Sequence, residues 1–195
     1  MATEIIPRWE WRTFGDNFSG ANNPFASYKG GDPKDSDEIY FLSPATSENV
    51  KVRDGLMDIK KFQYANADGL EQWKPVLKHG FPLPAENVKT VVEILGVAVP
   101  KLARAEYTQQ QFIDELMKPA GVRVVNVHKT RTRYTVEGCM AEVADVAADG
   151  KKTTTIAMEL EDAAQVIATV HKLGLDGYEN VSYPKGLKRL VGMQG

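Results

Sequence analysis

Charged side chains alternate with apolar or aromatic ones in several short stretches of the chain. In the first stretch, Arg8, Glu10 and Arg12 alternate with Trp9 and Trp11. Because successive side chains of an extended strand point to opposite faces, each stretch predicts a strand with one charged and one apolar face. The predicted strands cover residues 4–14, 38–43, 50–53, 57–62, 122–136, 139–146 and 153–160, with further strands expected within 70–77 and 96–107.

The stretch 129–145 shows this alternation most clearly. Lys129, Arg131 and Arg133 stand two residues apart, so in a strand they share one face. A turn at residues 137–138 would reverse the chain into a second strand that carries Glu142 and Asp145. These two acids have opposite parity, so a regular strand directs only one of them to the cationic side. Taken alone, the stretch is equally compatible with an ordinary solvated strand face.

Other segments have helical spacing or the composition of loops. Apolar residues at helical intervals predict helices over 84–95, over 108–117 with Thr108 as N-cap, and over 162–173. Residues 15–37 are rich in Gly, Asn, Ser, Asp and Pro, which predicts a flexible loop. The segment 180–191 is basic, and its simplest interpretation is a solvent-exposed tail.

Composition narrows the class of protein. With 195 residues, 43% hydrophobic and 26% charged, the chain is typical of a globular protein with one large domain or two small ones. A formal net charge of -2 gives no global basic field, so nucleic acid is not an expected partner. The single cysteine, Cys139, fits a reducing compartment, and no apolar run suits a membrane span. We therefore expect a cytoplasmic monomer or homodimer.

The charged strand faces could lie in two places. If they point outward, the fold is a sandwich or a helix-covered sheet; if they converge, the strands close into a barrel with a charged lumen. Desolvated charges cost several kcal/mol each, so a charged lumen would need water, internal carboxylates or a bound polyanion. Cations that hold phosphate oxygens, next to carboxylates that hold Mg²⁺ or Mn²⁺, would make a phosphoryl-transfer site.

Over nearly its whole length the chain resembles the CYTH domains, also called triphosphate tunnel metalloenzymes. The resemblance lies in the order of several charged segments rather than in a single motif. These segments are Glu10-x-Arg12, the hairpin with Lys51, Arg53 and Lys60, the pair Arg131 and Arg133, the acidic strand after it, Glu159-x-Glu161, and a basic segment around Lys185 and Lys188.

The resemblance implies one domain over residues 1–195 with an α+β fold, a closed eight-stranded antiparallel β-barrel that forms a tunnel, with flanking helices. It implies a metal-dependent hydrolase of inorganic triphosphate or of a nucleoside or thiamine triphosphate. A class IV-type adenylate cyclase is an alternative, because some members cyclise ATP. The expected ligand is a phosphorylated small molecule or polyphosphate.

Site residues can be carried over to matching positions of this sequence. The metal ligands for Mg²⁺ or Mn²⁺ would be Glu10, Glu142, Asp145, Glu159 and Glu161. The phosphate contacts would be Arg12, Lys51, Arg53, Lys60, Arg131, Arg133 and Lys185. The catalytic residues would be Glu159, Glu161 and Lys60.

One position departs from the family pattern. The opening signature of the family is Glu-x-Glu-x-Lys, whereas this chain has Arg8-Trp9-Glu10-Trp11-Arg12. A carboxylate is lost and a cation gained, which weakens a metal site and strengthens an anion site. A binder of phosphorylated ligands with little or no turnover is therefore a serious alternative to a hydrolase.

Overall fold

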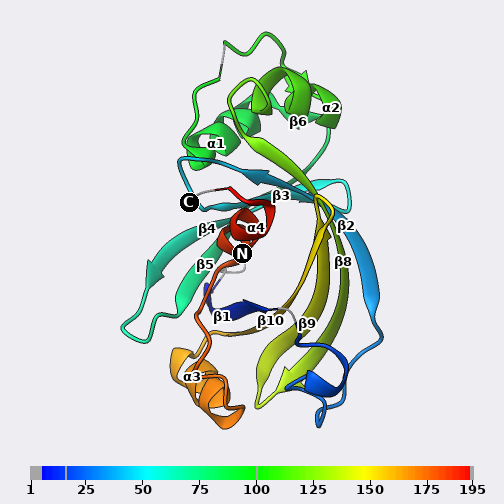
Figure 1. The fold of residues 1–195 in the computed structure, drawn as a ribbon. Coiled ribbons are helices and arrows are strands. Elements are labelled where there is room, and N and C mark those ends of the chain that lie inside the picture. Colours follow the sequence, from blue (N-terminus) through cyan, green and yellow to red (C-terminus); the bar gives the residue numbers. More distant parts are fainter. Residues whose placement is uncertain (1–5, 16, 100, 194–195) are drawn as a thin grey trace.

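Eight antiparallel strands close into a barrel in the computed structural model, which describes residues 6–15, 17–99 and 101–193. Around the barrel the strand order is β1-β10-β9-β8-β2-β3-β4-β5, with β5 pairing back to β1 (Figure 1). The predicted fold class is thus confirmed. The barrel strands are β1 (Arg8–Gly15), β2 (Lys34–Leu42), β3 (Asn49–Arg53), β4 (Leu56–Ala65), β5 (Glu71–Gly80), β8 (Arg123–Val136), β9 (Cys139–Ala148) and β10 (Lys151–Leu160).

Most predicted strands are found near their expected positions. β2 begins at Lys34 rather than at residue 38, so the loop after β1 is shorter than predicted and contains the short helix η1 (Gly20–Asn22). The strand predicted within 96–107 shrinks to β7 (Glu106–Tyr107), which pairs with β6 (Leu83–Pro84). Residues 4–5 of the first predicted strand lie outside the described part of the chain.

Three tight turns set the register of the barrel hairpins. Asp54-Gly55, Glu137-Gly138 and Asp149-Gly150 all have positive φ at both residues, the backbone geometry of two-residue hairpin turns. The second of these turns brings β8 and β9 together so that Arg133 lies opposite Glu142. Local turn chemistry therefore places cations and carboxylates side by side on the inner face of the barrel.

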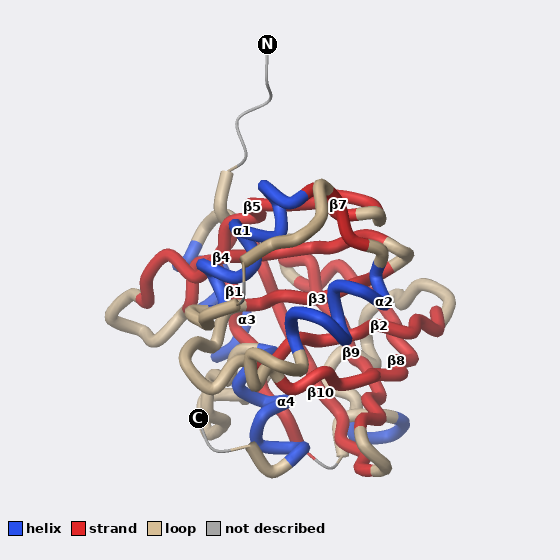
Figure 2. The backbone as a smooth tube through the Cα atoms, turned by 90° about the horizontal axis from the view of Figure 1, so that it is seen from above, coloured by secondary structure: helices blue, strands red, loops and turns tan. Residues whose placement is uncertain are grey.

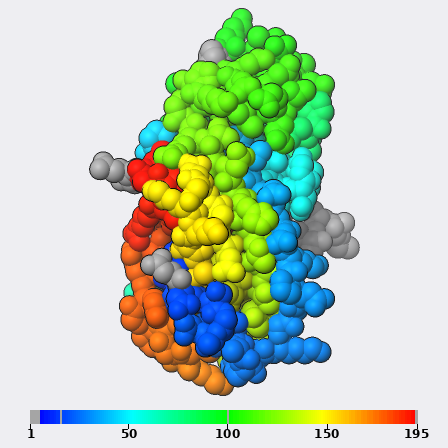
Figure 3. All heavy atoms as spheres, turned by 45° about the vertical axis from the view of Figure 1, so that its right-hand side comes forward, coloured from blue at the N-terminus to red at the C-terminus, as the bar shows by residue number. Residues whose placement is uncertain are grey.

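One helical layer covers the outer face of β2, β3 and β4. It comprises α1 (Ala85–Leu95), α2 (Gln109–Gln111) and the π-helical segment η2 (Phe112–Met117), and Figure 3 shows it as a lobe above the barrel. Its apolar side chains pack against the outward-pointing side chains of Val50, Val52 and Ile59. As predicted, Thr108 caps the second helix, accepting a hydrogen bond from the Gln111 backbone.

A second layer, α3 (Ala163–Lys172), covers the outer face of β1, β9 and β10. Val166 and Val170 pack against Trp11 and Met158 in one buried cluster, and the Asp162 carboxylate caps the helix. Trp11 therefore lies on the outer face of the barrel, on the apolar face of β1 that the alternation predicts. The opposite face of the strand, with Arg8, Glu10 and Arg12, points into the barrel.

The segment predicted as a solvated tail forms a helix, α4 (Tyr183–Val191), at one end of the barrel. Figures 1 and 2 show it against the ring of strands, on a different side from α1 and α2. Its Tyr183, Leu187 and Val191 share a buried cluster with inward-facing residues of β2, β8 and β9, such as Val125 and Val146. Within the described residues, no helix has the length and apolarity needed to cross a bilayer.

Candidate functional site

The barrel encloses a cavity of about 720 Å³. Its lining carries nine cationic side chains and four carboxylates, so cations exceed acids although the whole chain has a net charge of -2. The cations are Arg8, Arg12, Lys29, Lys51, Arg53, Lys60, Lys129, Arg131 and Arg133, and the acids are Glu10, Asp58, Glu142 and Glu159.

Burial increases along the cavity from an open mouth to a closed end. On the inner face of β8, Arg133 is exposed, Arg131 is half-buried and Lys129 is only 3% exposed. The next inward residues, Val127 and Val125, belong to the apolar cluster that α4 completes. The cations therefore line a blind channel whose deep end is closed by apolar packing.

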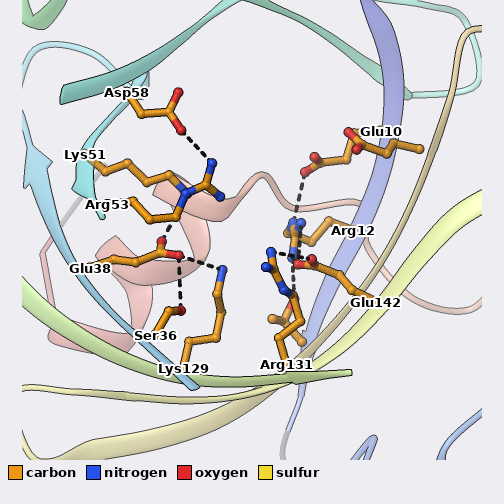
Figure 4. A network of polar contacts seen from close by, with 12 residues as sticks. Glu10, Arg12, Ser36, Glu38, Lys51, Arg53, Asp58, Lys129, Arg131 and Glu142 are labelled. Atoms are coloured by element: carbon orange, nitrogen blue, oxygen red, sulfur yellow. Dashed lines mark hydrogen bonds and ion pairs between the residues drawn. The ribbon is translucent and has the colours of Figure 1, made fainter. Parts of the chain in front are cut away.

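One ion-pair network is centred on Arg12 of β1. Its guanidinium donates to Glu10 at 2.9 Å and to Glu142 at 3.2 Å, and Arg131 donates to the other oxygen of Glu142 at 3.5 Å (Figure 4). Burial alone would raise the pKa of Glu142, but Arg12, Lys129 and Arg131 lower it to about 2. Glu142 is therefore a stable anion that holds the two guanidiniums in place.

A second network surrounds Glu38, which is 1% exposed. Its carboxylate accepts a hydrogen bond from Tyr40 at 2.9 Å. It also accepts one from Lys51 at 3.0 Å and lies 3.3 Å from the Lys129 ammonium (Figure 4). Despite burial, the two lysines lower the pKa of Glu38 to about 2. Burial lowers the pKa of Lys51 to about 8, and Glu38 opposes this shift. Nearby, Arg53 donates to Asp58 at 2.9 Å.

Glu159 of β10 has two cationic neighbours. Arg8 Nη1 lies 3.5 Å from one carboxylate oxygen, and Lys60 Nζ lies 3.7 Å from the other. Glu10 is the register partner of Glu159 on the neighbouring strand β1. The two glutamates are thus adjacent across the strands, but each is neutralised by a basic side chain.

The predicted metal ligands do not form a metal site in this arrangement. Among the residues that the structure describes, no three His, Cys, Asp or Glu side chains gather closely enough to hold a metal ion. Glu10 and Glu142 bond to Arg12, and Glu159 bonds to Arg8 and Lys60. Mg²⁺ and Mn²⁺ need several converging oxygen ligands, whereas these oxygens converge on guanidinium and ammonium groups. The donor set fits an anion better than a cation.

Three predicted site residues are not brought to the cavity. Asp145 is exposed on the outer face of β9, because β9 is regular there and Glu142 takes the inward position. Glu161 is exposed just beyond the end of β10, where the strand alternation no longer applies. Lys185 lies on α4 and forms an ion pair with Glu71 at 2.7 Å instead of facing the channel.

The remaining predicted residues all line the cavity, together with several that were not predicted as site residues. Lys29 lies at the mouth of the cavity, in the loop after β1. The composition of this loop did not indicate that Lys29 would line the cavity. Lys129 shares the parity of Arg131, so the alternation signals it. Glu38, which does not line the cavity itself but binds Lys51 and Lys129 there, alternates with Tyr40 in the predicted second strand, a weaker signal. Tyr183 reaches the cavity from α4, which the sequence did not predict.

Comparison with solved structures confirms the predicted likeness at the level of the fold. HpAC1 from Hippeastrum, named as an adenylyl cyclase and described as having a dominant triphosphatase activity, aligns with a TM-score of 0.51 and 12% identity. The alignment covers 96% of this chain and 97% of HpAC1. The PH1012 protein of Pyrococcus horikoshii OT3 aligns with a TM-score of 0.50 and 15% identity, covering 91% of this chain and 97% of that protein. No family model and no curated protein matches the sequence.

Proposed function

We propose that the barrel binds a condensed phosphate or a phosphorylated small molecule inside its cavity. The observation that carries this proposal is the excess of cations there, with nine basic side chains against four carboxylates around about 720 Å³. An enclosed volume of this size is typical of small-ligand sites. Partly desolvated cations are costly unless an anion or water compensates them, so a polyanion would stabilise the folded barrel.

The cations are suited to phosphate in chemical type and in position. Guanidinium groups donate two parallel hydrogen bonds to phosphate oxygens, and ammonium groups act as mobile point charges. Arg133 and Lys29, at the mouth, form no ion pair within the described part of the chain, so both are ready to receive an incoming anion. Arg131 and Lys129 follow deeper in the channel.

Hydrolysis of a phosphoric anhydride is the second candidate function. Glu10, Glu142 and Glu159 lie in the same cavity as the cations, and HpAC1, which shares the fold, is described as having a dominant triphosphatase activity. Arg12, Arg8 and Lys60 form ion pairs with these glutamates. Because the carboxylates are paired with basic groups, this arrangement argues against a bound Mg²⁺ or Mn²⁺. Binding is therefore the function that the geometry supports best.

A melting-temperature screen separates these functions. The protein would be heated with tripolyphosphate, pyrophosphate, ATP and thiamine triphosphate, each with Mg²⁺, with Mn²⁺ and with a chelator. A binder gains stability from a phosphate compound in the chelator alone, because the ligand binds only the folded state. The absence of any shift would refute the proposal.

Product analysis on the same samples tests turnover. A triphosphatase releases orthophosphate from tripolyphosphate, whereas cyclisation of ATP releases pyrophosphate. Release of orthophosphate from tripolyphosphate only in the presence of Mg²⁺ or Mn²⁺ would establish hydrolysis in place of simple binding. Pyrophosphate released from ATP together with cyclic AMP would instead identify a cyclase.

A further inference from the structure

Two buried tyrosines stack at the deep end of the cavity, and their hydroxyl groups differ. The rings of Tyr40 and Tyr183 have centroids 5.1 Å apart and an interplanar angle of 16°. The Tyr40 hydroxyl donates to Glu38 at 2.9 Å. The Tyr183 hydroxyl is buried and has no hydrogen-bond partner among the described residues. A buried hydroxyl without a partner is unfavourable, so this position calls for an acceptor.

Resting on the function proposed above, we infer that Tyr183 donates a hydrogen bond to the terminal phosphoryl group of the bound ligand. Tyr183 lines the cavity, whose charged lining is mainly cationic. The Arg12 guanidinium carbon and the Lys129 ammonium each lie 5.0 Å from the centre of its ring. An acceptor that enters this space next to two cations is expected to be an anion.

The direction of the channel identifies which part of the ligand arrives there. Behind Tyr183, the side chains of Leu187 and Val191 fill the barrel end together with Val125 and Val127. A linear phosphate chain that enters past Arg133 can go no further than Tyr183. The group that meets the hydroxyl is therefore the terminal phosphate, and any organic part of the ligand stays near the mouth.

The protonation state of Tyr183 suits this role. Burial raises the pKa of Tyr183 above its ordinary value, and Glu38 and Glu142 raise it further, whereas Arg12 opposes them. The hydroxyl therefore keeps its proton at neutral pH and is available as a donor.

Replacing each tyrosine by phenylalanine tests the inference, because both substitutions keep the stacked rings. Titration calorimetry with tripolyphosphate in a chelating buffer would give the affinity, and melting of the ligand-free protein would give the stability. We expect Tyr183→Phe to weaken binding by about tenfold or more, since hydrogen bonds to charged groups contribute at this level. Its ligand-free melting temperature should be unchanged or higher, because the removed hydroxyl has no partner.

Tyr40→Phe is the matched control. It removes one of the hydrogen-bond donors to buried Glu38, so the ligand-free melting temperature should fall, and the affinity should change far less than for Tyr183→Phe. Equal affinities for Tyr183→Phe and the wild type, or equal losses in both variants, would overturn the inference. If the wild type binds no phosphate compound, the proposed function itself is wrong, and this outcome is distinct from the first.

Discussion

Arg8 Nη1 lies 3.5 Å from Glu159 Oε1, so a guanidinium neutralises the carboxylate at the mouth of the barrel. Arg8 is the residue at which the sequence departs from the glutamate expected from its resemblance to the CYTH domains. Glu10, two residues on, is already bonded to Arg12. In this chain, basic side chains thus neutralise the acids that were predicted to bind a divalent metal, and phosphate binding without a metal is the expected consequence.

Replacing Arg8 by glutamate tests this relationship. We expect Mg²⁺ or Mn²⁺ at millimolar concentration to leave the melting temperature of the wild type unchanged and to raise that of Arg8→Glu. The substitution removes the cation beside Glu159 and adds a second carboxylate next to Glu10, which provides oxygen ligands for a hard cation. Differential scanning fluorimetry with and without chelator would measure the shift.

The control for this prediction is Arg8→Gln. It removes the positive charge without adding a carboxylate, so it should respond to metal much less than Arg8→Glu. A clear, chelator-reversible stabilisation of the wild type by Mg²⁺ would show that the ion pairs yield to metal and that our interpretation of Arg8 is wrong.

Arg131 should contribute strongly to phosphate affinity. It lines the cavity half-buried, and its only ion pair within the described residues is the 3.5 Å contact with Glu142. We expect Arg131→Ala to weaken tripolyphosphate binding by about tenfold or more. Arg131→Lys should retain part of the affinity, because lysine keeps the positive charge but cannot donate the bidentate hydrogen bonds of a guanidinium. Titration calorimetry would measure both variants.

Arg123 provides the matched control on the same strand. It is exposed near the opposite end of β8, outside the cavity lining, and pairs with Asp149 at 2.6 Å. Arg123→Ala should therefore leave the affinity close to that of the wild type. If both alanine variants lose affinity equally, general electrostatic attraction rather than the cavity would explain the binding.

The polar lining of the barrel could be predicted because strand geometry is local. Alternation in β1 put Arg8, Glu10 and Arg12 on one face, and the structure places all three in the cavity. The same parity rule decides between Glu142 and Asp145 once β9 is seen to be regular. What the sequence could not show is which carboxylate each cation would meet, since some of these pairs join residues more than a hundred positions apart, as Arg12 and Glu142 do.

The helix α4 was missed for a physical reason. Tyr183, Leu187 and Val191 recur at four-residue intervals and make an apolar stripe, but Pro184, Gly186 and three basic residues between them hide it. Packing inside the barrel end, rather than local propensity, stabilises this helix. Its Lys188 is buried and donates to the Thr46 carbonyl and the Ser47 hydroxyl, bonds that only the folded chain provides.

Gly186 should be essential for the fit of α4 in the barrel. A Cβ atom at this position would overlap the ring of Phe14, which is itself held in the barrel wall. We expect Gly186→Ala to destabilise the protein by about 1–3 kcal/mol, the usual cost of overpacking a core, and to lower the melting temperature by several degrees. Gly177→Ala is the control, because a Cβ there meets open space. Similar melting temperatures for both variants would contradict the close packing of α4 against Phe14.

Lys51 should make phosphate binding sensitive to pH. Burial lowers its pKa to about 8, so the ligand-free site loses this charge as the pH rises from 7 to 9, and the affinity for tripolyphosphate should fall. The stability of the ligand-free protein should change in the opposite direction. Between pH 8 and the unfolded pKa of about 10.4, the unfolded chain holds more protons at this residue, so this contribution to stability increases with pH.

Replacement of Lys51 by arginine separates this residue from the other titrating groups. The guanidinium stays charged throughout the pH range, so Lys51→Arg should show a flatter decline in affinity between pH 7 and 9. Calorimetry at several pH values would also detect proton uptake on binding to the wild type near pH 8, because a bound anion raises the pKa of the Lys51 ammonium. Identical pH profiles for the wild type and Lys51→Arg would exclude Lys51 as the titrating group.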